Sequence, residues 1–136
     1  MRIPEKNMAT VEISKSEQFQ HENQTWERVL NFFKQENNVL KTRLSVVLDQ
    51  EIGKDFLALA EQFQNRFILK DEFIGELNHD VNDQNRLLRE NMANGTQSVT
   101  GKLIKRQDKL RNEMEYLEKD FAFLKNEFNK YLSTVL

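Results

Sequence analysis

A histidine and an aspartate stand side by side near the middle of the chain, at His79 and Asp80. An adjacent carboxylate can orient an imidazole ring and raise its basicity. His79 lies two residues from Leu77 and two from Val81, which fall on the apolar side of a predicted helix. We therefore expect the imidazole to project away from that apolar side.

Residues 70–84 resemble the phospho-acceptor helix of histidine-kinase dimerisation domains. One subfamily of these domains has the spacing H-D-x-x-x-Q, which recurs here at His79, Asp80 and Gln84. The resemblance implies that His79 accepts a phosphoryl group, that Asp80 acts as a base on the imidazole, and that Gln84 positions a hydrolytic water. The helical spacing places Gln84 on the apolar side, away from His79. A solvated histidine on a charged helix face is the alternative interpretation.

Glu76 and His79 also form an E-x-x-H pair, which is the spacing that di-iron carboxylate bundles use. Folding the chain back on itself would bring His21, Glu22 and Glu113 near the same level. Such sites need two of these motifs with inward-facing ligands, whereas this chain has one motif and both histidines occupy outward positions. We therefore predict no metal site, no cofactor and no catalytic centre.

Basic residues gather in the stretch 83–111, which carries a net charge of +4 while the rest of the chain carries −6. Most of them fall on outward helix positions, where they could bind phosphates or an acidic partner. Aromatic residues for base stacking are not interleaved with them, so a nucleic acid is not the expected partner. Ordinary solvated charge is the alternative. The candidate anion-binding residues are Arg86, Arg89, Lys102, Lys105, Arg106, Lys109 and Arg111.

The element that must position these groups is one long helix over residues 54–94. Its apolar residues recur in alternating steps of four and three, which is the spacing of a seam that packs against another helix. A few polar residues occupy seam positions without breaking the helix. The seam consists of Phe56, Ala60, Phe63, Phe67, Lys70, Ile74, Leu77, Val81, Gln84, Leu88 and Asn91.

Two further helices are predicted, over about residues 17–50 and 98–133. Gly53 can adopt the left-handed conformation that closes a helix, so we expect a tight connection at about residues 50–54. A kinked continuous helix is the alternative there. Residues 92–101 collect glycines, an asparagine and hydroxyl side chains, which are typical of turns and helix caps. This second connection is therefore expected to join two antiparallel helices.

Folding the second and third helices back on each other makes their polar seam positions coincide. Gln84 then faces Gln107, and Leu88 faces Leu103. Two glutamine side chains carry both donors and acceptors, so they can satisfy each other within an apolar seam. We therefore predict an all-α fold, an elongated antiparallel three-helix bundle or coiled-coil hairpin.

The chain of 136 residues has room for one domain. Residues 1–16 show no helical stripe, so we expect a flexible N-terminal arm followed by a single bundle domain over 17–136. The absence of cysteine excludes disulfides and thiol catalysis. We predict no membrane span and no signal peptide, because no apolar run is long enough for the first and no apolar segment follows the N-terminus for the second. A cytoplasmic protein is expected.

The helices carry more apolar side chains than their seams need, and large exposed apolar patches usually mark an interface. This surplus favours a non-enzymatic helical-bundle protein that acts through protein–protein contacts, most simply as a homo-oligomer. A phosphotransfer or phospho-signalling module built on His79 and an anion-binding adaptor built on the basic residues are the alternatives. The candidate interface residues are Phe32, Ile68, Leu69, Phe73, Tyr116 and Phe123.

Overall fold

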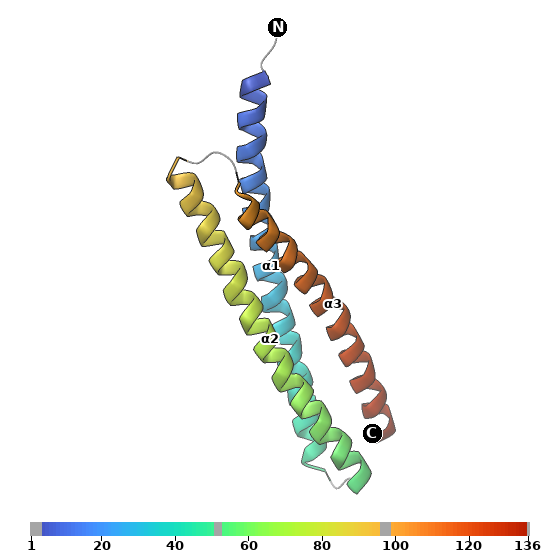
Figure 1. The fold of residues 1–136 in the computed structure, drawn as a ribbon. Coiled ribbons are helices and arrows are strands. Elements are labelled where there is room, and N and C mark those ends of the chain that lie inside the picture. Colours follow the sequence, from blue (N-terminus) through green and yellow to red (C-terminus); the bar gives the residue numbers. More distant parts are fainter. Residues whose placement is uncertain (1–3, 51–52, 96–98, 136) are drawn as a thin grey trace. The chain divides into compact units, whose positions relative to one another are not determined.

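A computed structural model describes most of the chain as helix, which confirms the predicted all-α class. The structure describes residues 4–50, 53–95 and 99–135, and it describes side chains for residues 15–50, 53–95 and 99–134. Contacts between the helices are those of a three-helix bundle. None of the described helices is long and apolar enough to cross a membrane. The helices are α1 (Pro4–Leu48), α2 (Lys54–Ala93) and α3 (Gly101–Val135) (Figure 1).

Helix α1 begins earlier than the sequence pattern predicts. Pro4 stands at its first position, where a fixed φ and a missing N–H are tolerated because the first N–H groups of a helix have no intrahelical partner. Residues 5–16 contain neither proline nor glycine, so the helix continues without a break. The predicted start near residue 17 is therefore wrong. Residues 1–3 lie outside the described residues, and the flexibility of the N-terminal segment stays a prediction.

The first connection separates two helices, as expected, but Gly53 plays a different part. The Gln50 N–H donates to the Val47 carbonyl at 3.1 Å, which closes the end of α1. The Gly53 carbonyl accepts from the Leu57 N–H at 3.0 Å and so starts α2. Among the described residues, the glycine with positive φ is Gly95. Gly53 thus stands at the start of α2 rather than at the end of α1, and residues 51–52 lie outside the described part.

The second connection has the predicted turn and cap chemistry. Gly95 has a φ of 80° just past the end of α2, and its N–H donates to the Met92 carbonyl at 3.0 Å. A left-handed residue at this position is the usual way to close a helix. Thr100 caps the start of α3, because its Oγ1 accepts from the Leu103 N–H at 3.3 Å. Residues 96–98, where the pattern places the start of the third helix, lie outside the described part.

Helix contacts group into two compact units, each of which contains part of every helix. Unit 1 comprises Met1–Val29 and Leu77–Met114, and unit 2 comprises Leu30–Glu76 and Glu115–Leu136. The two units are described separately below. The single-domain organisation stays a prediction.

Unit 1 has a small apolar core with a polar layer beside it. Leu88 packs with Val99 and Leu103, and all three side chains are buried. Phe19 and Ile104 are half-buried against this cluster. The contact between Leu88 and Leu103 confirms the predicted antiparallel pairing of α2 and α3 in this unit.

Unit 2 has an aromatic core. Rings from α2 and α3 interlock with centroids 5.0–6.3 Å apart, at Phe63, Phe67, Phe128 and Tyr131. The Tyr131 hydroxyl donates to the Phe56 carbonyl at 2.9 Å, and burial raises the pKa of Tyr131 above its ordinary value. The ring pairs between α2 and α3 are tilted or edge-on, whereas Phe63–Phe67 and Phe128–Tyr131, each within one helix, are stacked, and such clusters bury large apolar areas.

A polar residue of α1, Asn37, is buried in unit 2. The Asn37 Nδ2 donates to the Phe67 carbonyl at 2.9 Å and to Asp71 Oδ1 at 2.7 Å. Lys41 pairs with the other oxygen of Asp71. Because Asn37 reaches the backbone of a second helix, it can bond in one register only, which is the role that a seam asparagine is expected to have.

Candidate functional site

The most organised group of polar side chains is an amide network inside unit 1, contributed by all three helices. Asn23 Nδ2 donates to Asn85 Oδ1 at 3.1 Å, and Gln107 Nε2 donates to Asn23 Oδ1 at 2.8 Å. Gln84 Nε2 donates to Gln107 Oε1 at 3.2 Å and to the Leu103 carbonyl at 2.8 Å. These four amide side chains are buried. The contact between Gln84 and Gln107 confirms the pairing predicted from their spacing.

One edge of the amide network ends in charged side chains. Gln107 Nε2 also donates to Glu22 Oε1 at 2.8 Å, and Arg111 donates to both oxygens of Glu22 at 2.7 and 3.0 Å. These bonds to Glu22 raise the pKa of Arg111 above its ordinary value, and a bond to Asp108 has the same effect to a smaller extent. A two-point bond between a guanidinium and a carboxylate fixes orientation as well as distance. The Glu22–Arg111 pair therefore holds α1 against α3 within unit 1.

The predicted basic cluster is partly neutralised within unit 1. Arg86 and Arg106 both bond the carboxylate of Asp83, at 2.7 and 3.1 Å. Hydrogen bonds from Arg86 and then Arg106 hold the pKa of Asp83 below its ordinary value. Arg86 also bonds Glu90 at 2.8 Å, and Lys109 lies 3.9 Å from Glu113. Of the seven predicted anion-binding residues, three have no ion pair among the described side chains, and these are Arg89, Lys102 and Lys105.

The histidine motif is divided between solvent and core. His79 is exposed, as its spacing predicts, and Asp80 is half-buried. Gln84 is fully buried and belongs to the amide network, so it does not share a surface with His79. In this arrangement Gln84 cannot position a water beside the imidazole. Phosphotransfer at His79 stays a hypothesis supported by the exposure of the imidazole and by its neighbour Asp80.

The residues considered for a metal site are already engaged or exposed. Glu22 binds Arg111 and Gln107, and Glu113 lies near Lys109. His79 projects into solvent. Within the described residues, no three histidine or carboxylate side chains gather closely enough to hold a metal ion.

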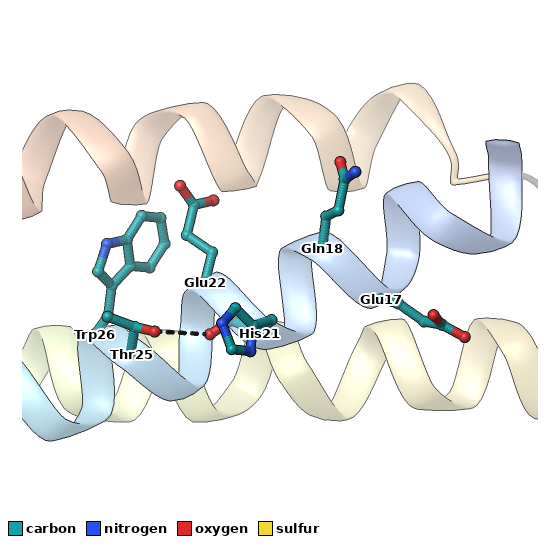
Figure 2. A pocket seen from close by; sticks show the side chains of 6 residues that line it. All are labelled: Glu17, Gln18, His21, Glu22, Thr25 and Trp26. Carbon is teal, nitrogen blue, oxygen red and sulfur yellow. Dashed lines mark hydrogen bonds between the residues drawn. The ribbon is translucent and has the colours of Figure 1, made fainter.

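A hollow of about 620 Å³ lies along α1 in unit 1 (Figure 2). Gln18 and Glu22 point toward α3, whereas Glu17 points away from it (Figure 2). Thr25 Oγ1 donates to the His21 carbonyl at 3.1 Å, which is a bond within the helix. The hollow is thus bordered by a carboxylate that already has partners, by a half-buried Trp26 and by exposed polar groups. This combination does not assemble a reactive centre.

Unit 2 carries the second notable feature, an exposed apolar surface. The described side chains include nine exposed large apolar residues, and all nine belong to unit 2. Five of the six predicted interface residues are among them, while Phe73 is half-buried with its ring 5.9 Å from that of Tyr116. We call this set the unit 2 apolar surface. It consists of Phe32, Val39, Val46, Leu57, Leu59, Ile68, Leu69, Tyr116 and Phe123.

Sequence reasoning missed some members of both features. Val39 and Val46 follow Phe32 at intervals of seven, so a search for exposed apolar residues at heptad spacing would have found them. Asn23 stands seven residues before Leu30, which is also buried, but a search for apolar residues at heptad spacing passes over an asparagine. Asn85 is buried beside the seam position Gln84, and no sequence signal indicated that it would be.

The fold and these features define a three-helix bundle with a buried amide network in unit 1 and an exposed apolar surface in unit 2. Comparison with protein-family models, with curated proteins and with solved structures finds no match. A function therefore has to follow from the chemistry of the described residues.

Proposed function

We propose that this protein is a non-enzymatic helical-bundle scaffold that acts through protein–protein contacts and self-associates through the unit 2 apolar surface. The observation that carries the proposal is the distribution of exposed apolar side chains. All nine belong to unit 2, and Leu69, Tyr116 and Phe123 are each about 60% exposed. Exposed apolar residues scattered singly are normal, whereas apolar residues gathered in one region of the surface usually mark an interaction site.

The polar features of unit 1 support a structural role rather than a chemical one. Glu22, Asp83 and Arg111 hold helices together through ion pairs, and Gln84 lies in the amide network. A catalytic group needs access to a substrate and a protonation state matched to its task. Side chains that are already bonded to each other across helices serve the fold instead.

The test is the solution mass measured by light scattering over a concentration series. We expect a mass of at least two chains for the wild type. A triple variant with one substitution on each helix, Phe32→Lys, Leu69→Lys and Phe123→Lys, should shift the mass toward that of one chain. These side chains are exposed, so the helix content should be unchanged.

A control variant adds the same charge at exposed polar positions of unit 1, through Gln24→Lys, Asn82→Lys and Asn112→Lys. Its mass should match that of the wild type. A wild-type chain that remains monomeric at every concentration would contradict self-association. An equal loss of mass in both variants would show that added charge, rather than lost apolar contact, is responsible.

A further inference from the structure

Within unit 2, α2 and α3 border a groove that is lined by both apolar and charged side chains. Lys70 pairs with Asp120 across it, and Arg66 forms an ion pair with Glu127 beside it, with the nearest nitrogen and oxygen 2.6 Å apart. A hollow of about 290 Å³ lies here, bordered by Leu69, Phe73, Tyr116 and Leu124 as well as by these charges. Because these charges are already paired, the groove offers a new partner mainly apolar contact. Phe123 stands seven residues after Tyr116 and therefore on the same side of α3, and we call Leu69, Phe73, Tyr116 and Phe123 the α2–α3 face.

The two edges of the α2–α3 face carry opposite charges. Glu61 and Glu72 are exposed on α2, and Lys119 and Lys130 are exposed on α3. Glu72 directly precedes Phe73, and Lys119 directly precedes Asp120. Because successive residues of a helix point in directions about 100° apart, Glu72 and Lys119 lie on the sides of the two helices that face away from the groove. None of these four side chains forms an ion pair among the described residues. Between Glu61 and Glu72 on α2, and between Lys119 and Lys130 on α3, one edge of the face is therefore acidic and the other basic.

The opposite charges also lie at matching levels along the helices. Lys70 lies beside Asp120 and Phe73 beside Tyr116, so Glu72 lies near the level of Lys119. Phe63 and Phe128 have ring centroids 5.2 Å apart, which by the same antiparallel pairing puts Glu61 near the level of Lys130. Glu61 and Glu72 thus each have a basic residue at their own level on the other edge.

We propose that a second copy of this chain binds the α2–α3 face, with α2 of one copy against α3 of the other. This inference rests on the proposed self-association and assigns it a face and an orientation. A two-fold axis parallel to the helices keeps every residue at its level and exchanges the two edges. It therefore sets Glu72 opposite Lys119 of the second copy, and Glu61 opposite Lys130, and each pairing occurs twice.

The other simple two-fold axis, perpendicular to the helices, would place α2 against α2. The acidic edges would then meet each other and so would the basic edges, and like charges across an interface are unfavourable. By the antiparallel pairing of α2 and α3, the acidic Glu76 and Glu115 lie near the same level, so under the parallel axis Glu76 would face Glu115 of the second copy and repel it. The contact accordingly covers the part of the face from Leu59 to Phe73 on α2.

The first test compares two variants in sedimentation equilibrium of the full chain. Phe123→Lys places a charge in the middle of the α2–α3 face, and we expect it to raise the self-association Kd by about tenfold or more, as loss of a central aromatic contact does. Gln35→Lys adds the same charge at an exposed position of α1 in the same unit. It should leave the Kd within about twofold of the wild-type value. Circular dichroism checks that both variants keep their helix content.

The second test is a charge exchange, which addresses the orientation. Glu72→Lys and Lys119→Glu should each raise the Kd by about three- to tenfold, because an exposed ion pair is weak but each change acts twice in the symmetric dimer. The double variant should return to within about twofold of the wild-type Kd, since the pairs re-form with reversed polarity. Restoration would support the α2-against-α3 orientation.

Three results would overturn the inference, and they can be told apart. A wild-type dimer that Phe123→Lys leaves intact removes this face but leaves the proposed self-association in place. A double charge variant that associates no better than the single variants removes the orientation. A wild-type chain that is monomeric at every concentration removes both the inference and the self-association on which it rests.

Discussion

Gln107 is the residue on which the buried polar layer of unit 1 depends. Its amide donates to Asn23 and Glu22 and accepts from Gln84, so it links all three helices. Its side chain is fully buried. A buried amide contributes little net stability when it is fully bonded, but its removal leaves a buried polar atom, Asn23 Oδ1, without its hydrogen bond in a low-dielectric interior.

Replacing this hub with an apolar side chain should therefore destabilise the protein even though leucine is the more hydrophobic residue. We expect Gln107→Leu to lower the free energy of unfolding by about 1–3 kcal/mol, because the buried Asn23 Oδ1 loses its partner. Urea unfolding followed by circular dichroism measures the change. The control is Gln24→Leu at an exposed position of α1, which should stay within about 0.5 kcal/mol of wild type. An unchanged stability in Gln107→Leu would show that the network adapts to the loss.

At the scale of single helices, one glycine lies inside α2 and another just past its end, and only the second has a backbone conformation that requires glycine. Gly95 stands past the helix end with a φ of 80°, a conformation that side chains with a Cβ rarely adopt. Gly75 lies inside α2, where an added Cβ would meet nothing within 4 Å. Glycine is the best residue at the first position and a poor one at the second, because its backbone freedom is used only where φ is positive.

The same substitution should consequently act in opposite directions at these two sites. Gly95→Ala should lower the free energy of unfolding by about 1 kcal/mol, since alanine must adopt a strained left-handed conformation. Gly75→Ala should raise it by about 0.5–1 kcal/mol, because alanine has the higher helix propensity. Thermal and urea unfolding of both variants provide the measurement. Two changes of the same sign would contradict the assigned helix end.

For the whole molecule, charge and apolar exposure are divided between the two units. The seven predicted anion-binding residues belong to unit 1, and the exposed apolar residues belong to unit 2. Four of the seven cations form ion pairs with Asp83, Glu90, Glu113 or Glu22. A cation that is already paired releases few counterions when a polyanion approaches, so the effective charge of unit 1 is smaller than the sequence indicates.

The salt dependence of polyanion binding measures this effective charge. With a single-stranded oligonucleotide as a polyanion probe, we expect weak binding and a log–log salt slope of about −2, which corresponds to three available cations. A slope near −5 would mean that all seven cations are available and that the ion pairs open on binding. Fluorescence anisotropy over a range of salt concentrations gives the slope. Lys102→Gln with Lys105→Gln should remove most of the binding.

The helices and much of their pairing could be predicted from the sequence because they depend on local periodicity. Alternating steps of four and three define one face of a helix, and matched polar positions such as Gln84 and Gln107 define how two helices align. Turn chemistry located the connection at Gly95. Gly53 was expected to close the first helix but stands at the start of α2, because a glycine beside a helix can either end it or precede it, and composition alone does not distinguish the two.

Only the tertiary structure decided which polar and apolar side chains depart from this periodic pattern. Asn23 and Asn85 are buried because partners from other helices meet them there, and a single-helix pattern contains no information about those partners. Arg106 and Asp83 are distant in the sequence, so their ion pair and the neutralised charge follow from packing. By itself, the sequence determined an all-α bundle with surplus apolar side chains. The packing of three helices determined that the exposed ones lie in unit 2, because burial depends on what covers a residue.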